Sequence, residues 1–517
     1  MADVEALLDE QTEIPRVRFT QRERRGALLG RSWAQLFLAG GVLLGVLLAV
    51  IVFGWGKVWW LLLPGVPLLI LALWMWHGES LLKLVGQSIR YLVRAMQGRT
   101  KFRRKVWARV TTTALPTGKP AERIPVPVVA RKLTLPGGLA DVQFVDIPTR
   151  GGFVYNAKDA VASVTIRVRA SAWMLRDDSK KVAVHGGFGA WLSSLEGLPG
   201  LTEVDLRVRV DRAPSTELVE YAARRDEQRE SIVSDAVQKE YDWLVATEQA
   251  RSMEFTSTIT ATFDVRQLSM DIRDSGGGLT GLSAILTDRV KAIRDALPEL
   301  DVEFEEWLTA DGLDAAVSTG LDPMAASVRR ERLGRSDQEA DTRSPLMAID
   351  EKRSTVEVDD SVHRTLWIHE WPRTRVRVGF LRPLLYTGTA TRCLTIRFRP
   401  VPMHEAIREV GQAATDIESA ARIRERMGNR VGVLQRREEE DLEEREEDLA
   451  DGYTDGRFRA FVSISAANLS EVRRDQTSLE QAGYQAHVRM GVMHDQQWAA
   501  LATAVLPVPT RAKRSKK

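Results

Sequence analysis

Two long uncharged stretches near the start of this chain constrain its fold more than any other feature. They cover residues 33–55 (WAQLFLAGGVLLGVLLAVIVFGW) and 58–76 (VWWLLLPGVPLLILALWMW), and only Gly56 and Lys57 separate them. A helix rises about 1.5 Å per residue, so each stretch is long enough to cross a hydrocarbon core of roughly 30 Å. The sequence therefore predicts a two-helix transmembrane hairpin at residues 33–76.

Basic residues on both flanks of this predicted hairpin indicate its orientation. The flanking basic residues are Arg22, Arg24, Arg25, Arg31, Arg99, Lys101, Arg103, Arg104 and Lys105. Positive charge concentrates on the cytoplasmic side of membrane proteins. We therefore expect a multi-pass protein of the plasma (inner) membrane, in contact with the lipid bilayer, with both termini and the main domain in the cytoplasm.

The segment that follows, residues 77–110, is predicted to hold a basic amphipathic juxtamembrane helix. Its apolar residues recur at helical spacing between residues 79 and 96, and Lys83, Arg90 and Arg94 fall between them. Such a helix can lie along an anionic lipid surface or pack against the body of the protein. The sequence leaves both interpretations open.

Composition says little about partners of the remaining chain. The 517 residues carry a net charge of only +3, so nothing global indicates nucleic-acid binding. The single cysteine, Cys393, excludes an internal disulfide and a multi-cysteine metal site. It lies in a stretch of alternating apolar residues, where we expect a small core side chain.

Alternating and helical patterns predict two α/β units after the hairpin, at residues 140–321 and 361–507. Each is expected to run strand, helix, strand, long charged helices, strand, helix, strand, helix, and a linker at 322–360 separates them. The expected elements include strands at 161–170 and 202–210, a helix at 279–297, and long charged helical stretches at 215–253 and 404–450. This order is typical of a ferredoxin-like unit with a helical insertion. The predicted fold is therefore a membrane-anchored α+β protein with two such units, a basic segment at residues 1–32 and a basic tail at 508–517.

No catalytic, cofactor-binding or metal site is predicted. A phosphate-binding Walker loop needs Gly-Lys-Ser/Thr after a first glycine, and the pairs Gly56-Lys57 and Gly118-Lys119 both lack the rest of the pattern. Residues 276–278 (GGG) precede a predicted helix without a lysine and indicate a flexible turn. His363 and His369 could share a strand face, but too few other ligands lie nearby for a metal ion.

Two charge patterns allow more than one interpretation. The acidic run at residues 437–451 is typical of a solvated helix face, and a docking surface for a basic partner is the alternative. Paired arginines occupy alternate strand positions, which suits a solvated sheet face or a nucleic-acid surface. These pairs are Arg167/Arg169, Arg207/Arg209 and Arg397/Arg399.

Two regions resemble components of conjugative, type IV secretion-like machines. Residues 16–105, with GESLLKLVGQSIRYLVRAMQGRTKFRRKV after the apolar stretches, resemble the PrgI-type small membrane subunit. Residues 359–507, with RTLWIHEWPRTRVRVGFLRPLL, CLTIRFRPVPMHEA and FRAFVSISAANLSEVRRDQTSLEQAGYQAHV, resemble the N-terminal, non-motor domain of the VirB-class conjugation ATPase. Together they are similar to a membrane protein of actinobacterial conjugation-like gene clusters.

The resemblance implies a structural, non-enzymatic platform subunit that recruits a separate conjugation-type ATPase beside other secretion-apparatus subunits. In the related ATPases the motor follows the stretch matching ATAVLPV, whereas here PTRAKRSKK follows it. We therefore expect the ATPase to contact residues 494–517. The candidate docking residues are Arg511, Lys513, Arg514, Lys516 and Lys517. A homo-oligomer is compatible with this function, and the alternative is a membrane-anchored module that binds nucleic acid and presents DNA to a pore.

Overall fold

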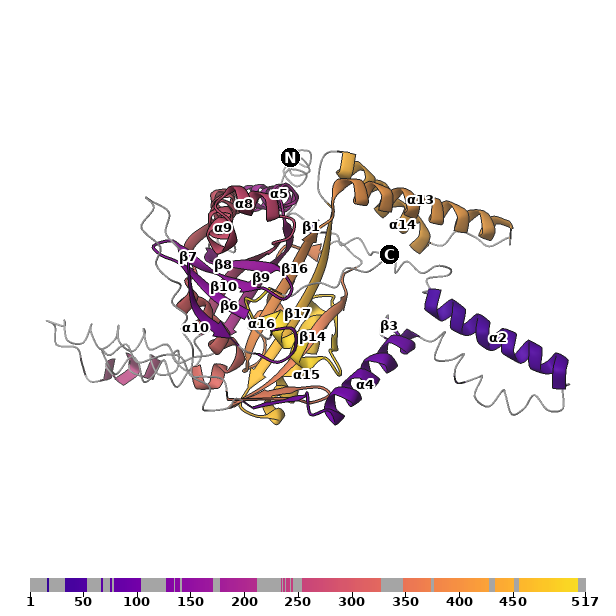
Figure 1. The fold of residues 1–517 in the computed structure, drawn as a ribbon, viewed down its shortest axis with the longest axis horizontal. Coiled ribbons are helices and arrows are strands. Elements are labelled where there is room, and N and C mark those ends of the chain that lie inside the picture. The colour runs from indigo at the N-terminus through magenta and orange to yellow at the C-terminus, as the bar shows by residue number, and fades with distance from the viewer. Residues whose placement is uncertain are drawn as a thin grey trace.

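The alternation of apolar and polar residues builds one large antiparallel sheet, which we describe from a computed structural model (Figure 1). In strand β10 (Glu254–Asp264), Ile259 and Phe263 face one side and Thr260 and Thr262 the other, because successive strand residues point to opposite faces. Fourteen strands join the sheet, in the order β4-β12-β13-β14-β17-β16-β9-β10-β8-β7-β6-β5, with β11 on β8 and β18 on β14.

The structure describes most of the chain after residue 78. The described residues are 16–17, 33–53, 67, 75–76, 79–103, 127–133, 135–139, 142–170, 177–211, 253–326, 347–372, 376–426, 433–450 and 455–509, with isolated positions between 234 and 244.

The strands fall into two halves of the sheet. The first half comprises β5 (Val128–Leu133), β6 (Val142–Ile147), β7 (Gly151–Asn156), β8 (Val161–Ala170), β9 (Leu201–Asp211), β10 and β11 (Val302–Trp307). The second half comprises β4 (Lys101–Arg103), β12 (Ala348–Glu351), β13 (Val356–Val358), β14 (Ser361–Glu370), β16 (Thr391–Pro400), β17 (Gly456–Ala466) and β18 (Arg489–Val492).

The two halves repeat one order of strands. In the first half β9, β10 and β8 lie side by side, and the far edge of β8 pairs with β7 along its first part and with β11 along its last part. In the second half β16, β17 and β14 have the same arrangement, and β14 pairs with β13 and then with β18. The halves meet where β9 pairs with β16, and we call this strand pair the seam.

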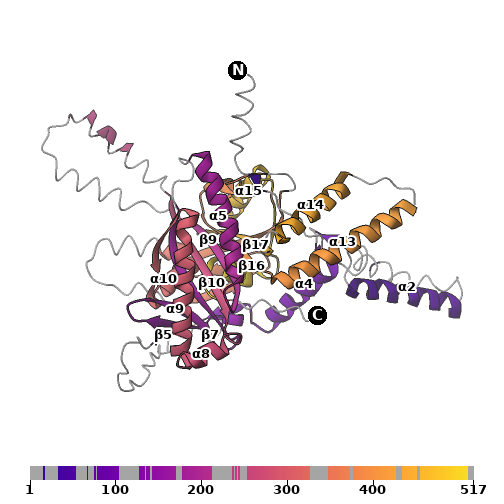
Figure 2. The ribbon, with the colours of Figure 1, turned by 90° about the horizontal axis from the view of Figure 1, so that it is seen from above.

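Helices cover both faces of the sheet. One face is covered by α5 (Asp178–Glu196), α8 (Ser269–Asp274), α9 (Gly278–Ala296), α12 (Arg382–Tyr386) and α15 (Leu469–Gln485). The opposite face is covered by α10 (Ala310–Leu321) and α16 (Gln497–Val505). Two short 3-10 turns, η2 (Gly137–Leu139) and η4 (Leu297–Leu300), complete the body. Figure 2 shows α5 and α9 together over the strands of the first half.

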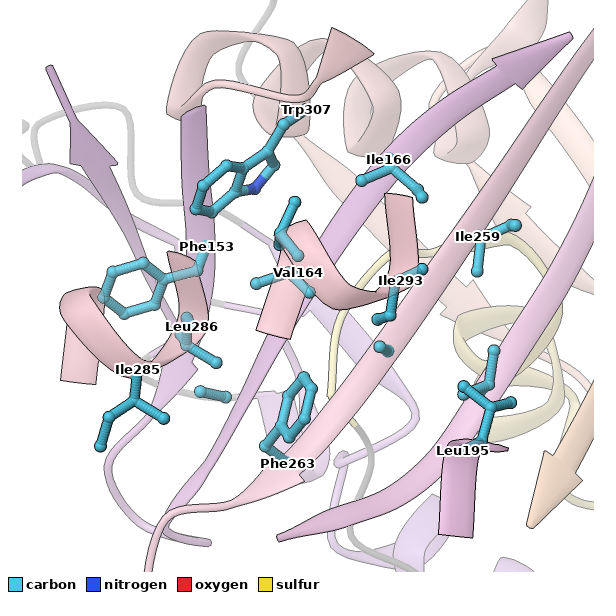
Figure 3. Close-up of a cluster of buried hydrophobic side chains, with 14 of the residues drawn as sticks. Phe153, Val164, Ile166, Leu195, Ile259, Phe263, Ile285, Leu286, Ile293 and Trp307 are labelled. Atoms are coloured by element: carbon cyan, nitrogen blue, oxygen red, sulfur yellow. The ribbon is translucent and has the colours of Figure 1, made fainter. Parts of the chain in front are cut away.

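The largest core lies under α5 and α9. Figure 3 shows Ile285, Leu286 and Ile293 of α9 in one cluster with strand side chains such as Val164 and Phe263. All of these side chains are buried. Burial of a large apolar side chain contributes about 1.5–3 kcal/mol, so this cluster fixes α9 on the sheet.

A pair of helices leaves the sheet between β16 and β17. These are α13 (Met403–Arg426) and α14 (Val433–Ala450), which confirm the predicted charged helical insertion at residues 404–450 and project away from the body (Figure 1). Val401, Ala406, Val410 and Leu449 form a small apolar cluster at their base. The corresponding stretch at 215–253 in the first half lies almost wholly outside the described residues.

The predicted pair of separate ferredoxin-like units is wrong. Residues 204–210 of β9 pair with residues 392–398 of β16, so the strands of both halves belong to one continuous sheet. The physical reason is that an edge strand exposes a row of unpaired N–H and C=O groups, and each half covers that edge of the other. The sequence pattern predicts strands but not which edges meet. Part of the predicted linker at 322–360 also joins the sheet, as β12 and β13.

The predicted transmembrane hairpin is also wrong. The first stretch contains α2 (Trp33–Phe53), yet within the described ranges no helix combines the length and the apolar character needed to cross a membrane. At the end of the second stretch, β2 (Met75–Trp76) pairs with β3 (Glu79–Ser80), and extended backbone there cannot be the last turn of a helix. The multi-pass membrane localisation, which depended on this hairpin, is corrected with it.

Candidate functional site: the seat of the C-terminal helix

A row of polar side chains crosses the sheet on the face that α16 covers. They come from alternate strand positions and therefore share one face. The row consists of Ser163 and Thr165 on β8, Thr260 on β10, Arg207 on β9, Cys393 and Thr395 on β16, Ser463 and Ser465 on β17, and His363 and Thr365 on β14. All of them are buried, so each needs a hydrogen-bond partner inside the protein.

The C-terminal end of α16 supplies partners for the centre of this row. The last carbonyl groups of a helix have no partner within the helix. Here the Ala504 carbonyl oxygen accepts hydrogen bonds from Arg207 Nε at 3.1 Å, Thr395 Oγ1 at 2.5 Å and Cys393 Sγ at 3.2 Å. Arg207 Nη2 donates to the Leu506 carbonyl at 3.0 Å. A helix of the second half is thus capped by an arginine of the first.

The N-terminal end of α16 is held by an amide side chain. Gln497 is fully buried, and its Oε1 accepts a hydrogen bond from the backbone N–H of Thr365 at 2.9 Å. Its Nε2 donates to the carbonyl oxygens of Thr365 at 3.1 Å and Met493 at 2.9 Å. Trp498 Nε1 donates to the Pro136 carbonyl at 3.0 Å, which again links α16 to the first half.

Apolar packing completes the site that holds α16 on the sheet, which we call the seat. The buried side chains of this segment are Trp498, Ala500, Leu501, Ala502, Ala504, Val505, Leu506 and Val508. All of them except Ala500 join one core cluster with α10, β6 and β13, so the cluster contains residues from both halves. The segment is therefore an internal element that joins the halves, and the structure describes it as far as Pro509.

This finding restricts the predicted ATPase contact at residues 494–517. Residues 497–508 lie almost entirely in the core and offer little surface to a partner. The five predicted docking residues, Arg511, Lys513, Arg514, Lys516 and Lys517, lie outside the described part of the chain.

Beside α16, buried acids of β9 form ion pairs with arginines of β16 across the seam. Arg397 on β16 donates to both oxygens of Asp205 on β9, at 2.6 and 2.7 Å, and lies 3.1 Å from Glu203. Arg399 also pairs with Glu203, at 3.1 Å. Burial by itself lowers the pKa of Arg397, but the charges of Asp205 and Glu203 outweigh it and raise that pKa. Burial raises the pKa of Glu203 despite its arginine partners.

Most of the arginines beside the seam therefore do not lie on a solvated face. Arg207, Arg209 and Arg397 are largely buried, and Arg209 pairs with Asp211 at 2.8 Å. On β8, Arg167 and Arg169 are more exposed, and they pair with Glu306 and Glu305 of β11. Sequence reasoning missed these ion pairs, although the acids at 203, 205 and 211 share strand parity with the arginines at 207 and 209 and could have indicated them.

The other predicted residues have structural roles. His363 is fully buried, with Nδ1 2.7 Å from Ser465 Oγ and Nε2 2.8 Å from the Leu321 carbonyl oxygen. Cys393 is a core side chain, as expected, and burial raises the pKa of its thiol. Residues 276–278 form the expected turn, with positive φ at all three glycines. Among the described residues no group of three or more His, Cys, Asp or Glu side chains could hold a metal ion.

The predicted membrane-flanking residues are only partly described. Lys101 and Arg103 lie on the edge strand β4, and Lys101 lies 4.0 Å from Asp350. Arg99 follows α4 (Leu81–Met96) and donates its backbone N–H to the Arg94 carbonyl at 2.8 Å. Arg22, Arg24, Arg25, Arg31, Arg104 and Lys105 lie outside the described residues.

Comparison with known proteins adds no relative. Protein-family models give no match to this chain, and a search of curated proteins gives none either. The polar groups of the seat bond to the backbone and to one another, an arrangement suited to holding the C-terminal segment in a fixed position.

Proposed function

We propose that this chain is a structural platform subunit of a conjugation-like, type IV secretion-like transport apparatus, and that it holds a separate ATPase. The observation that carries the proposal is the seat of α16. Arg207 and Ser163 of the first half bond to the carbonyl oxygens of Leu506 and Pro507, while Thr395 of the second half bonds to that of Ala504. A partner bound just beyond this point is held at a defined position relative to both halves.

The resemblance supports the kind of partner. In the ATPases that residues 359–507 resemble, the motor follows the stretch that here forms the end of α16. A separate motor that docks on residues 510–517 would take the corresponding place. The basic residues of that segment suit an acidic patch on the partner.

The test is co-purification from the native host. Replacing Arg511, Lys513, Arg514, Lys516 and Lys517 by serine leaves every described contact unchanged, and we expect it to reduce recovery of a P-loop ATPase at least tenfold. A matched control replaces five exposed charged residues of α14 by serine: Glu440, Glu443, Glu444, Glu446 and Glu447. The proposal is contradicted if no P-loop ATPase co-purifies with the unaltered chain. It is also contradicted if the purified chain binds ATP saturably at micromolar concentrations.

The alternative function, a module that binds nucleic acid, receives less support. Three of the six arginines that suggested it are largely buried, and all six pair with acids. The alternative requires DNA affinity that falls steeply between about 50 and 200 mM salt, because released counterions dominate such binding. Titration of the full chain with duplex and single-stranded DNA at both salt concentrations separates the two functions.

A further inference from the structure

Helix α4 is attached to the body by its polar side. Ser88 Oγ donates to Asp495 Oδ2 at 2.6 Å, and the Arg94 guanidinium donates to Glu351 Oε2 at 2.9 Å and to the Asp495 carbonyl oxygen at 2.8 Å. Tyr91 OH is 3.4 Å from the Glu351 carbonyl oxygen. Both acids are buried, so α4 is oriented by directional bonds to fixed groups.

The opposite side of α4 is apolar and faces outward. Ile89 is 54% exposed, Leu92 57% and Met96 88%, and Val85 and Val93 on the same side are also exposed. An amphipathic helix on a globular body normally turns its apolar stripe toward the core. Here the reverse holds, and contiguous exposed apolar surface of this kind marks an interaction site.

The spacing of these residues fits a helix as the partner. The exposed apolar residues follow one another at intervals of four, three and four, which is the spacing of the buried positions of a coiled coil; they are Val85, Ile89, Leu92 and Met96. We call these four residues the α4 stripe. The α4 stripe lies opposite Arg94, the residue that holds α4 to the body. The positions that flank the α4 stripe are uncharged, namely Gly86, Ser88, Val93 and Ala95, and an added Cβ at Gly86 would meet nothing within 4 Å.

We propose that the α4 stripe binds the α4 stripe of a second copy of the chain, through an α4–α4 helix pair. Uncharged flanking positions cause no repulsion between identical helices, whereas a helix that selects a different partner usually carries charges there. A helix that lies on lipid is bordered by basic residues, but Gly86 borders one side of the α4 stripe and Ser88 and Ala95 the other. The proposal does not depend on the recruitment of an ATPase.

The oligomeric state of the full chain tests the proposal. We expect light scattering coupled to size-exclusion chromatography to show a dimer, and the double variant I89S/L92S to raise the dissociation constant at least tenfold. Circular dichroism should stay unchanged, because both side chains are exposed. Two controls replace exposed apolar residues elsewhere, M270S/Y484S on α8 and α15 and L44S/L48S on α2.

Three outcomes would overturn the proposal. The first is a full chain that is monomeric at about 50 μM, and the second is a dimer that dissociates in L44S/L48S but not in I89S/L92S. The third is sedimentation of the full chain with anionic phosphatidylglycerol vesicles that I89S/L92S abolishes while the dimer persists. That third result would show that the α4 stripe binds a lipid surface.

Discussion

At the scale of single residues, His363 couples the stability of the protein to pH. It lies fully inside the protein, and burial lowers its pKa from 6.5 to about 4. The unfolded chain takes up this proton near pH 6.5 and the folded chain only near pH 4, so between these values the unfolded state binds more protons. Stability contributed by the neutral imidazole is therefore lost as pH falls from 6.5 to 4.

We predict that this one group removes about 3 kcal/mol of unfolding free energy across that interval. The measurement is urea unfolding at several pH values, compared with H363Q, whose amide can still donate to the Leu321 carbonyl oxygen. The variant should show a flatter pH profile. Because Asp475 and Asp495 also have lowered pKa values and lose stability in acid, only the difference between the two profiles counts. Identical profiles would contradict the prediction.

Arg207 is the second residue with a predicted effect. It is 5% exposed and bonds to the carbonyl oxygens of Ala504 and Leu506. We expect R207M to lower the unfolding free energy by about 3 kcal/mol or more, because it removes the guanidinium donor to the buried Leu506 carbonyl oxygen and one of three donors to that of Ala504. The control R169M removes a guanidinium that is 71% exposed and paired with Glu305, and should cost under about 1 kcal/mol. Equal urea midpoints for the two variants would contradict this stabilising role of Arg207.

At the scale of elements, we predict that two glycine-to-alanine substitutions in helices change the stability in opposite directions, because only one of the glycines lies at a close contact between α8 and α9. A Cβ added at Gly281 in α9 would lie 2.1 Å from the Ile272 carbonyl oxygen of α8, whereas one added at Gly186 in α5 would meet nothing within 4 Å. We expect G281A to destabilise the protein by about 1–3 kcal/mol through overpacking. We expect G186A to stabilise it by about 0.5–1 kcal/mol through helix propensity. Thermal unfolding measures both, and a stabilising G281A would be the contrary result.

Individual elements could be predicted well from the sequence because their signals are local. The strand expected at 161–170 is β8, that at 202–210 lies within β9, and the helix expected at 279–297 is α9 within one residue at each end. Strands β4, β5, β6, β7, β12 and β13 were not predicted. Each has six residues or fewer, and in β6 the apolar residues at 142, 144, 145 and 147 do not alternate strictly with polar ones.

The candidate site could not be predicted in the same way, because it depends on distant pairings. Arg207 and Thr395 lie opposite each other only through the register of β9 and β16, which are far apart in the chain. The burial of α16 was missed for a related reason. Its small residues, such as Ala500 and Ala504, predict a helix but not how many sides of it are covered.

At the scale of the whole molecule, we predict from the pairing of β9 with β16 that the two halves unfold together. They share a paired strand edge, buried ion pairs and the seat of α16, and disruption of one half exposes the polar row of the other. We expect calorimetry of the full chain to show one unfolding transition that includes both halves. Two well-separated transitions, each with the heat capacity change of one half, would show that the seam couples them weakly.

The repeated strand order has a consequence for symmetry. Two identical polypeptides that joined through the same strand would have to use every side chain twice, so a charge near the axis would meet its own copy. In this chain Asp205 lies opposite Arg397 and Arg207 opposite Thr395. Because both halves are encoded in one polypeptide, each can change without its counterpart. The join can therefore combine an acid with a base, and α16 can bond to both halves at the seam while α10, which follows β11 in the first half, packs on β5, β6 and β7.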